Sequence, residues 1–332
     1  MRKLFLVVLV FAVLSCADEP QYSKITGSTM GTTYNVIVDS STASPQDIYQ
    51  DIEVELKDIN QLMSTYIPNS EINRFNQLAN ASCFRFSAKT WHVLQASKQI
   101  YDETNGAFDI TLGPLISRWG FNVEEYDQKV PSEEQVNQLL TRVGTDKLEF
   151  DHINQCISKK HPQITINLSA IAKGYGVDRV AAIIEQHGVN NYLVEIGGET
   201  KAKGINTMGS KWRVAIEQPV SLKQQKMLVV GLTDTSIATS GDYRNYYEVD
   251  GERFSHTINP RTGYPISHKL ASVSVIHPQN MYADAYATAL NVMGPDEALA
   301  FAQQHKLPVY LITHEGSELK SQRTESFSKF IQ

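Results

Sequence analysis

The chain has 332 residues with a formal net charge of −6, and 42% of its residues are hydrophobic. This content suits a large buried core in one domain or two closely packed domains, and it excludes a disordered chain. The acidic balance and the lack of any run of Lys and Arg exclude a basic nucleic-acid-binding surface. We therefore expect no nucleic-acid partner.

The first residues have the pattern of an export signal. Met1-Arg2-Lys3 supply positive charge, and the apolar run Leu4–Leu14 is too short to span a bilayer. Ser15-Cys16 then completes a segment similar to the lipobox of bacterial lipoproteins, in which Cys16 is acylated. An ordinary secretory signal is the alternative, but a cysteine directly after the cleavage site favours the lipoprotein. We expect residues 1–15 to be the signal peptide and residues 16–24 to be a lipid-anchored linker.

Two cysteines remain after Cys16, namely Cys83 and Cys156. No C-x-x-C pair and no His-rich cluster accompanies them, which gives little support for a zinc site or a redox dithiol. They can form a disulfide in an oxidising compartment or remain free thiols. The sequence leaves both possibilities open.

The predicted elements begin with a strand or hairpin over Ile25–Val38, interrupted by two glycines. Apolar residues then recur at the spacing of one helix face from Ile48 to Met63. Further helices are predicted over Lys89–Thr104, from a capping serine at Ser132, and over Leu168–His187.

Strand-like runs lie between and after these helices. They cover Gln163–Leu168, Tyr192–Ile196, Trp212–Glu217, Met227–Leu232, Ala271–Ile276 and Pro308–Thr313. Strands and helices do not alternate strictly, so the order favours an α+β fold with mixed or antiparallel sheets and packed helices. No long linker divides the chain, and we expect one catalytic unit over residues 25–332, with two intertwined lobes as an option.

The usual nucleotide-binding motifs are absent, because the sequence has neither G-x-x-x-x-G-K-[ST] nor a G-x-G-x-x-G between a strand and a helix. Ala172-Lys173-Gly174, near the beginning of a predicted helix, offers another way to hold a pyrophosphate. Backbone N–H groups and a lysine at a helix N-terminus suit an anion. A solvated surface lysine is the more common situation, so this segment alone is weak evidence.

A carboxylate and a hydroxyl four residues apart mark the predicted helix that starts near Asn280 and ends at Gly294-Pro295. Asp284 and Thr288 lie on the same helix face, about one turn apart. Hard oxygen ligands of this kind are what Mg²⁺ prefers, usually with substrate phosphates completing the shell. The alternative is structural, with the threonine hydroxyl bonded to the carbonyl four residues earlier. Spacing alone does not decide between them.

The segment Ser255–Pro265 is a short strand that runs into a polar turn with Pro and Gly. Loops of this kind often carry function on a rigid scaffold. His256 in it is a candidate general base, since its ordinary pKa is near neutral, although a lone histidine is more often structural. Gly197-Gly198-Glu199 and Asn105–Asp109 are either plain turns or backbone that holds a flavin ring.

Taken in order, these segments resemble the ApbE family of flavin transferases over nearly all of the mature chain. The resemblance is carried by six segments and the His256 loop: Gly27–Thr32, Ser64–Tyr66, Gly106–Asp109, Leu168–Tyr175, Ile196–Glu199 and Ala283–Thr288. Each segment is weak evidence alone, whereas their common order is strong evidence. The resemblance implies an ApbE-like α+β fold and FAD:protein FMN transferase activity.

The resemblance also implies the site residues. The positions that match the FAD site are Met30, Tyr66, Ala107, Phe108, Asp109, Asn167, Lys173 and Ile258. The positions that match the Mg²⁺ ligands are the Ala170 carbonyl, Asp284 and Thr288. His256 matches a proton-transfer histidine, with Asp284 as a second candidate base. Many relatives carry Asp where this chain has Asn167, so a hydrogen bond to the flavin is retained but a charge is not.

From the resemblance we expect Mg²⁺-dependent transfer of FMN from FAD to a Thr or Ser hydroxyl, with release of AMP. The expected acceptors are flavoprotein subunits of respiratory or electron-transport complexes, such as sodium-pumping quinone reductases. The expected location is the periplasmic side of the inner membrane, through the lipid anchor. Two alternatives stay open: an FAD pyrophosphatase that releases FMN and AMP, and a non-catalytic periplasmic FAD-binding lipoprotein.

Overall fold

The computed structural model describes residues 21–79, 82–121, 130–217, 228–241, 246–249, 252–316 and 318–332. The predicted signal peptide and Cys16 lie outside the described residues. Within these ranges, no helix combines the length and the apolar character needed to cross a bilayer.

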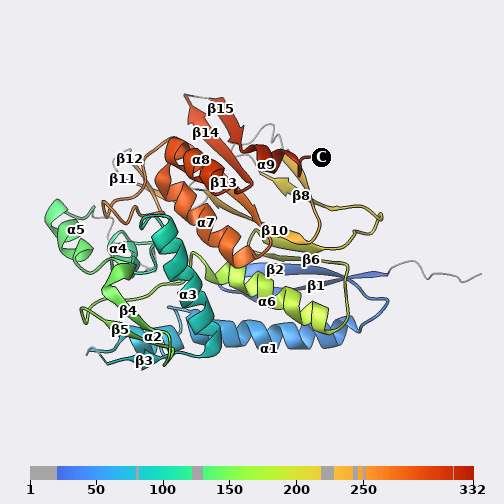
Figure 1. The fold of residues 1–332 in the computed structure, drawn as a ribbon, viewed down its shortest axis with the longest axis horizontal. Helices are drawn as coiled ribbons and strands as arrows, with labels where there is room; N and C mark the ends of the chain where they lie inside the picture. The colour runs from blue at the N-terminus through green and yellow to red at the C-terminus, as the bar shows by residue number, and fades with distance from the viewer. Residues whose placement is uncertain are drawn as a thin grey trace, which may run out of the picture.

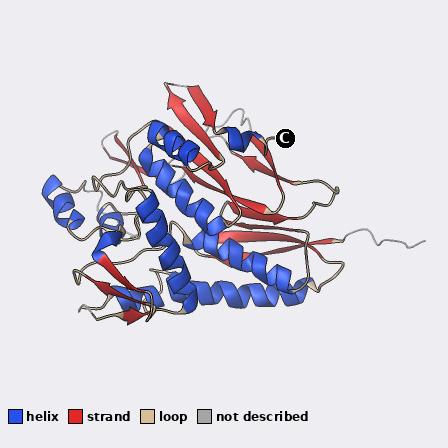
Figure 2. Cartoon of the chain, in the orientation of Figure 1, coloured by secondary structure: helices blue, strands red, loops and turns tan. Residues whose placement is uncertain are grey.

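The helices are short to medium in length and are spread along the chain (Figure 2). They are α1 (Pro45–Met63), α2 (Glu71–Asn76), α3 (Ala88–Glu103), α4 (Gly113–Arg118), α5 (Glu133–Leu140), α6 (Ala172–Gln186), α7 (Asn280–Met293), α8 (Pro295–Gln304) and α9 (Glu325–Ser328), with the 3₁₀ turn η1 (Thr145–Lys147).

One large sheet forms the centre of the molecule, with strand order β1-β2-β6-β7-β10-β13-β14-β15 and antiparallel pairing throughout. Its strands are β1 (Tyr22–Thr29), β2 (Thr32–Asp39), β6 (Tyr192–Ile196), β7 (Glu199–Lys203), β10 (Thr235–Gly241), β13 (Leu270–His277), β14 (Val309–Glu315) and β15 (Glu318–Arg323). The smaller sheets contain β3 (Phe84–Arg85), β4 (Leu148–Asp151), β5 (Cys156–Lys159), β8 (Trp212–Ile216), β9 (Leu228–Leu232), β11 (Tyr246–Val249) and β12 (Glu252–Ser255).

Helices cover one face of the large sheet (Figure 1). Alternate residues of β2 point to that face, where Tyr34, Val36 and Val38 are fully buried against α1 and α6. The apolar stripe of α1 runs from Ile48 to Met63 and is buried along its whole length. Burial of such a stripe is the main source of stability for a surface helix.

The opposite face of the large sheet is covered by β8, β9 and α9. Trp212, Leu232 and Phe327 belong to the buried cluster there, and Ile37 of β2 packs against it from the sheet. Because Ile37 alternates with the helix-facing residues of β2, both faces of this strand lie against packed layers. The predicted α+β class is therefore confirmed, and the described pairings are antiparallel rather than mixed.

Most predicted elements agree with the structure, but one predicted strand is wrong and two boundaries differ. The run Gln163–Leu168 is not a strand, because the Ile166 backbone is bound by a side chain instead of a neighbouring strand. The helix predicted from Leu168 begins at Ala172, after a turn. β1 begins at Tyr22, so the last residues of the predicted linker 16–24 belong to the sheet.

Cys83 and Cys156 form a disulfide across 73 residues of sequence, with Cα atoms 5.4 Å apart. The sulfur atoms lie next to Asp151 in a group with the geometry of a metal site, but both cysteines are bonded to each other. The pairing that the sequence left open is thus decided in favour of a disulfide, which joins β5 to the segment before β3.

Candidate functional site

Three charged side chains meet at the first turn of α6. The Lys173 ammonium lies 2.6 Å from Oε1 of Glu199 and 3.8 Å from Oδ1 of Asp284. Glu199 is 3% exposed and Asp284 is 5% exposed, whereas the lysine side chain keeps 30% of its surface accessible. With both carboxylates ionised the cluster carries a net charge of −1 and is open to solvent on the lysine side.

Gly174 allows α6 to approach α7 closely at this cluster. A Cβ on Gly174 would lie 2.4 Å from the Asn280 carbonyl oxygen and 2.8 Å from the Asp284 Cβ. The Gly174 N–H donates a hydrogen bond of 2.9 Å to Oδ2 of Asp284. That bond fixes one carboxylate oxygen and leaves Oδ1 directed toward Lys173.

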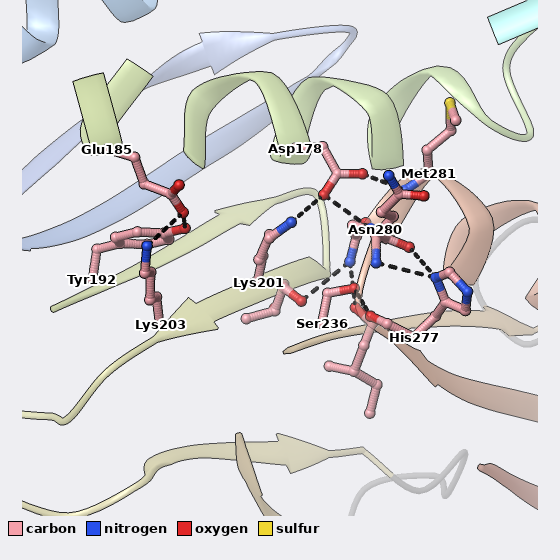
Figure 3. A network of polar contacts seen from close by, with 12 residues as sticks. Asp178, Glu185, Tyr192, Lys201, Lys203, Ser236, His277, Asn280 and Met281 are labelled. Atoms are coloured by element: carbon pink, nitrogen blue, oxygen red, sulfur yellow. Dashed lines mark hydrogen bonds and ion pairs between the residues drawn. The ribbon is translucent and has the colours of Figure 1, made fainter. Parts of the chain in front are cut away.

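The beginning of α7 is capped by a side chain from α6 (Figure 3). Asp178 accepts hydrogen bonds from the backbone N–H groups of Asn280 and Met281, at 3.0 and 2.9 Å, and pairs with Lys201 at 2.7 Å. The N-cap residue Gln279 makes no side-chain cap bond of its own. A carboxylate here satisfies free N–H groups and favours the positive end of the helix dipole. This cap fixes the register of α7, and with it the position of Asp284 one turn later.

Burial and neighbouring charge shift the pKa values in this cluster. Burial raises the pKa of Glu199 to about 7, and the Asp284 charge adds to that effect while Lys173 opposes it. For Lys173, burial lowers the pKa, but the charges of Asp284 and Glu199 outweigh burial and raise it above the ordinary lysine value. Lys173 is therefore a permanent cation, whereas Glu199 changes its charge near neutral pH.

Asp284, Thr288 and Ala170 carry oxygen donors that suit a hard divalent cation. The Thr288 hydroxyl, one helical turn from Asp284, has no hydrogen-bond partner among the described residues, so the structural alternative, a bond to the carbonyl four residues earlier, is not formed there. Ala170 lies half-buried in the turn just before α6. A carboxylate, a hydroxyl and a carbonyl are the donor set that Mg²⁺ takes in proteins. The residues present fit such an ion.

Met30 lies at the tight turn between β1 and β2, with φ of 50°. Residues 28–33 line a hollow of about 450 Å³ that is open to solvent. Met30 also packs between the two large buried clusters, and its Cε lies 3.0 Å from the position of a Cβ on Gly176 in α6. The Met30 turn therefore lies next to the first turns of α6, the helix that carries Lys173. Thr32 contacts Gly197, which precedes Glu199 by two residues.

The Ala107–Asp109 segment is bound tightly to its surroundings. Ala107 and Phe108 are buried, and the Asp109 carboxylate accepts hydrogen bonds from Thr111 and Thr145, at 2.6 and 2.9 Å from their hydroxyls. Burial raises the pKa of Asp109, although these hydrogen bonds oppose the rise. The Asp109 side chain thus organises its own loop, and what the segment offers a ligand is chiefly its backbone.

The segment that contains Asn167 is held by a residue that we did not predict. Asn76 donates a 2.9 Å hydrogen bond to the Ile166 carbonyl and accepts a 2.7 Å bond from the Ile166 N–H. Lys159, 2% exposed, donates a 3.0 Å bond to the Asn76 carbonyl. Burial lowers the pKa of Lys159 to about 8. Asn167 then pairs through its N–H with Ile110, at 2.7 Å, which joins this segment to the Phe108 loop.

The remaining predicted residues lie on separate loops. Tyr66 follows α1 with 75% of its surface exposed. Ile258 is 2% exposed, and its loop is held by a 2.8 Å bond from the Trp119 ring N–H to the Gly263 carbonyl. The His256 ring lies 6.5 Å from the Phe121 ring. The structure thus places Lys173 next to Asp284. That Tyr66, Ile258 and His256 belong to the same site stays a prediction.

Glu199 is a residue of this cluster that the sequence pattern indicated only as part of a turn. Its neighbours Gly197 and Gly198 have φ of 58° and 106°, a left-handed backbone that favours glycine. A carboxylate at the start of a buried strand needs a partner, and that was the available signal. One of its oxygens, Oε2, is buried without a hydrogen-bond partner in the described part of the chain.

We predict that replacing Glu199 by glutamine changes the pH dependence of stability. The folded pKa of about 7 exceeds the ordinary value of 4.5, so the folded chain holds this proton more tightly than the unfolded chain. The resulting stabilisation is complete below the ordinary value and is lost as pH rises toward 7. We expect the wild-type free energy of unfolding to fall by up to roughly 3 kcal/mol relative to Glu199→Gln over this window. Urea unfolding in EDTA at a series of pH values measures this, and parallel pH curves would contradict it.

The chain is similar to several known proteins over nearly its whole length. The model of the ApbE family matches residues 30–311. The FAD:protein FMN transferase of Haemophilus influenzae is 41% identical, over 98% of this chain and 96% of its own length. The solved structure of the flavin transferase ApbE from Vibrio cholerae is 38% identical, with a TM-score of 0.88 over 94% of this chain and 99% of that chain.

A second solved structure, the apo form of the flavinyl transferase ApbE from Pseudomonas stutzeri, is 35% identical. It covers 94% of this chain and 97% of that chain, with a TM-score of 0.86. These likenesses extend over the charged cluster, both helices that carry it and the loops around it. The chain therefore belongs to the ApbE family.

Proposed function

We propose that this chain transfers the FMN moiety of FAD to a Thr or Ser hydroxyl of an acceptor protein. The observation that carries the proposal is the cluster of Lys173, Glu199 and Asp284 at the first turn of α6. Thr288 follows Asp284 by one helical turn, and its hydroxyl has no hydrogen-bond partner in the described ranges. A fixed cation next to hard oxygen ligands suits a pyrophosphate. The relatives named FAD:protein FMN transferase, at 41% and 38% identity, support this choice of substrate.

In the proposed reaction, the acceptor hydroxyl oxygen forms a bond to the phosphorus on the riboflavin side. The phosphoanhydride bond breaks, and AMP leaves with the bonding electron pair. Lys173 holds the pyrophosphate in line, and the partner charges of Glu199 and Asp284 keep its ammonium in place. Mg²⁺ held by Asp284, Thr288 and the Ala170 carbonyl would neutralise the negative charge that develops during this phosphoryl transfer.

The proton of the acceptor hydroxyl needs a base, because an alcohol is a poor nucleophile at neutral pH. His256 is the first candidate, since an imidazole can accept a proton in this pH range. Asp284 is the second, although a carboxylate bound to a cation is a weaker base. If His256 is the base, its replacement should slow FMN transfer without weakening FAD binding.

The flavin is proposed to lie against the Met30 turn, the Ala107–Asp109 loop and Tyr66. Tyr66 offers an exposed ring, and aromatic rings stack favourably on flat heterocycles. Asn167 is proposed to hydrogen-bond the flavin. Its Oδ1 accepts a 2.9 Å bond from the Ser169 N–H, which leaves its amide hydrogens as donors.

We further propose that the chain is lipid-anchored through Cys16 and works on the periplasmic side of the inner membrane. The disulfide between Cys83 and Cys156 supports this location, since disulfides persist in oxidising compartments such as the periplasm. The proposed acceptors are flavoprotein subunits of respiratory or electron-transport complexes, of the sodium-pumping quinone reductase type.

One assay tests the proposed function against its two alternatives. The chain without residues 1–16 is incubated with FAD, Mg²⁺ and an acceptor domain, followed by denaturing electrophoresis and AMP analysis. A fluorescent acceptor band together with AMP is the expected result. AMP from wild-type protein without a labelled acceptor indicates an FAD pyrophosphatase, and neither product indicates a flavin-binding protein. Either of the last two results contradicts the transferase.

A further inference from the structure

The loop between β7 and β8, residues 204–211, presents two apolar side chains to solvent. Met208 is 72% exposed and Ile205 is 42% exposed. Isolated exposed apolar residues are common on protein surfaces. What distinguishes this pair is the rigidity of the loop and its position next to the N-terminal end of the described chain.

Asn206 holds this loop in one conformation from inside. It is 7% exposed, and its Oδ1 accepts hydrogen bonds from the N–H groups of Met208 and Ser210, at 2.8 and 3.2 Å. Its Nδ2 donates a 2.8 Å bond to the Lys211 carbonyl. Met208 therefore projects from a fixed backbone, which lowers the entropy lost when it binds a surface.

The loop adjoins the point where the chain enters the fold. The Tyr22 hydroxyl donates a 2.9 Å hydrogen bond to the Ile205 carbonyl, and the Tyr22 ring meets Trp212 edge-on at 5.9 Å. Figure 1 shows the loop that leads into β8 and the start of β1 at the same end of the molecule. Tyr22 is six residues after Cys16, and six extended residues span at most about 20 Å. An acyl anchor on Cys16 thus keeps this loop close to the bilayer.

The charges around the loop and the expected anchor are mixed. Lys24 and Lys211 are exposed and form no ion pair with any residue in the described ranges. Asp234 is the exposed acid beside the loop, where it accepts a hydrogen bond of 3.3 Å from the Gly204 N–H. Asp39 lies near Tyr22, and Asp18 and Glu19 follow Cys16 in the sequence, so the charge around the loop and the anchor is not positive overall. The apolar pair therefore provides the contact.

We propose that the 204–211 loop is a second membrane contact, with Ile205 and Met208 inserted into the interfacial layer of the bilayer that carries the Cys16 anchor. The inference rests on the proposed lipid anchor. The Ile205 N–H also bonds to Asn191, at 3.0 Å, just beyond the C-terminal end of α6. Lys173 lies at the other end of that helix, about 20 Å away. Two contacts, in place of a single tether, would hold the catalytic site away from the membrane and toward soluble acceptor domains.

An environment-sensitive fluorophore tests the contact. The full-length acylated chain with Met208→Cys is labelled with NBD and reconstituted in phosphatidylethanolamine and phosphatidylglycerol vesicles. The new thiol is the single labelling site, since Cys16 is acylated and Cys83 is bonded to Cys156. We expect a several-fold rise in NBD emission with a blue shift. The matched control, Ile153→Cys, labels an even more exposed apolar position in the turn between β4 and β5, at 93% exposure, and its emission should not change.

Three results would overturn the proposal, and each has a different meaning. An aqueous NBD spectrum at position 208 on chains that float with the vesicles shows that the loop does not touch lipid. Shielding that occurs only in native membranes, and not in protein-free vesicles, assigns the loop to a protein partner. If mass spectrometry finds no acyl groups and the chain does not float with the vesicles, there is no lipid anchor and the proposed contact fails with it. The transfer assay still measures the activity independently.

Discussion

We expect replacement of Asp284 by asparagine to reduce FMN transfer severely while leaving the fold intact. Asparagine keeps the shape of the side chain, and its carbonyl oxygen can still accept the bond from the Gly174 N–H. What is lost is the negative charge that faces Lys173 and that would bind a hard cation. Removing a group that stabilises developing charge typically costs 10²–10³ in rate, and we expect a loss of at least about 10³ in kcat/KM here. The measurement is the rate of flavin fluorescence gained by the acceptor.

The matched control for this charge removal is Asp296→Asn. Asp296 is exposed in the first turn of α8, outside the site, so transfer should stay at the wild-type rate. The melting temperature of both variants should remain close to wild type. Wild-type transfer by Asp284→Asn would refute the ligand assignment, and a collapse of its melting temperature would show that the carboxylate is needed for folding instead.

The local spacing of apolar residues predicted the long helices α1, α3, α6 and α7 and strands such as β6, β13 and β14, whereas α2, α4 and α8 and the strands β4, β5 and β10 were not predicted. The stripe from Ile48 to Met63 predicted α1 because burial repeats with the helix period. The same logic failed at Gln163–Leu168, where the apolar alternation is real but the backbone partner is the Asn76 side chain, 90 residues away. Periodicity reports which residues are buried and does not report what binds their backbone.

The site was predictable in its residue types but not in its connections. Lys173 and Asp284 were selected by resemblance, yet the pairing of Lys173 with Glu199 and the cap from Asp178 to Asn280 join positions 26 and 102 residues apart. No spacing rule reaches that far in a single sequence. The Ala170 carbonyl is a still harder case, because a backbone ligand can belong to any residue type.

We expect the second large effect from Gly174→Ala. This variant should lose stability because α6 and α7 approach each other closely at this position. In a helix, replacing glycine by alanine ordinarily gains up to about 1 kcal/mol, because alanine restricts the unfolded chain. Here the new Cβ would lie 2.4 Å from the Asn280 carbonyl oxygen, which is a backbone atom. Asn280 cannot retreat easily, since its N–H is bound by Asp178 and its Nδ2 donates to the Thr200 and Ile237 carbonyls, at 3.1 and 3.0 Å.

Steric overlap should therefore outweigh the helix propensity. We expect a net destabilisation of about 2–3 kcal/mol, in the range of overpacked cores, measured by urea unfolding. The shift of α6 also moves the Gly174 N–H away from Asp284. Transfer should therefore fall by at least about tenfold, which corresponds to a loss of about 1.4 kcal/mol of transition-state stabilisation.

Gly176→Ala in the same helix is the comparison that isolates the cause. Its Cβ would meet the Met30 Cε at 3.0 Å and the Ile196 Cδ1 at 3.4 Å, both at the ends of flexible side chains. These atoms can move by a few tenths of an ångström, so the stability loss should stay below about 1 kcal/mol. If Gly174→Ala were as stable as Gly176→Ala, the two helices could separate without cost, and close packing would not be what positions Asp284. If only Gly174→Ala loses both stability and transfer, the fit between the helices positions the carboxylate.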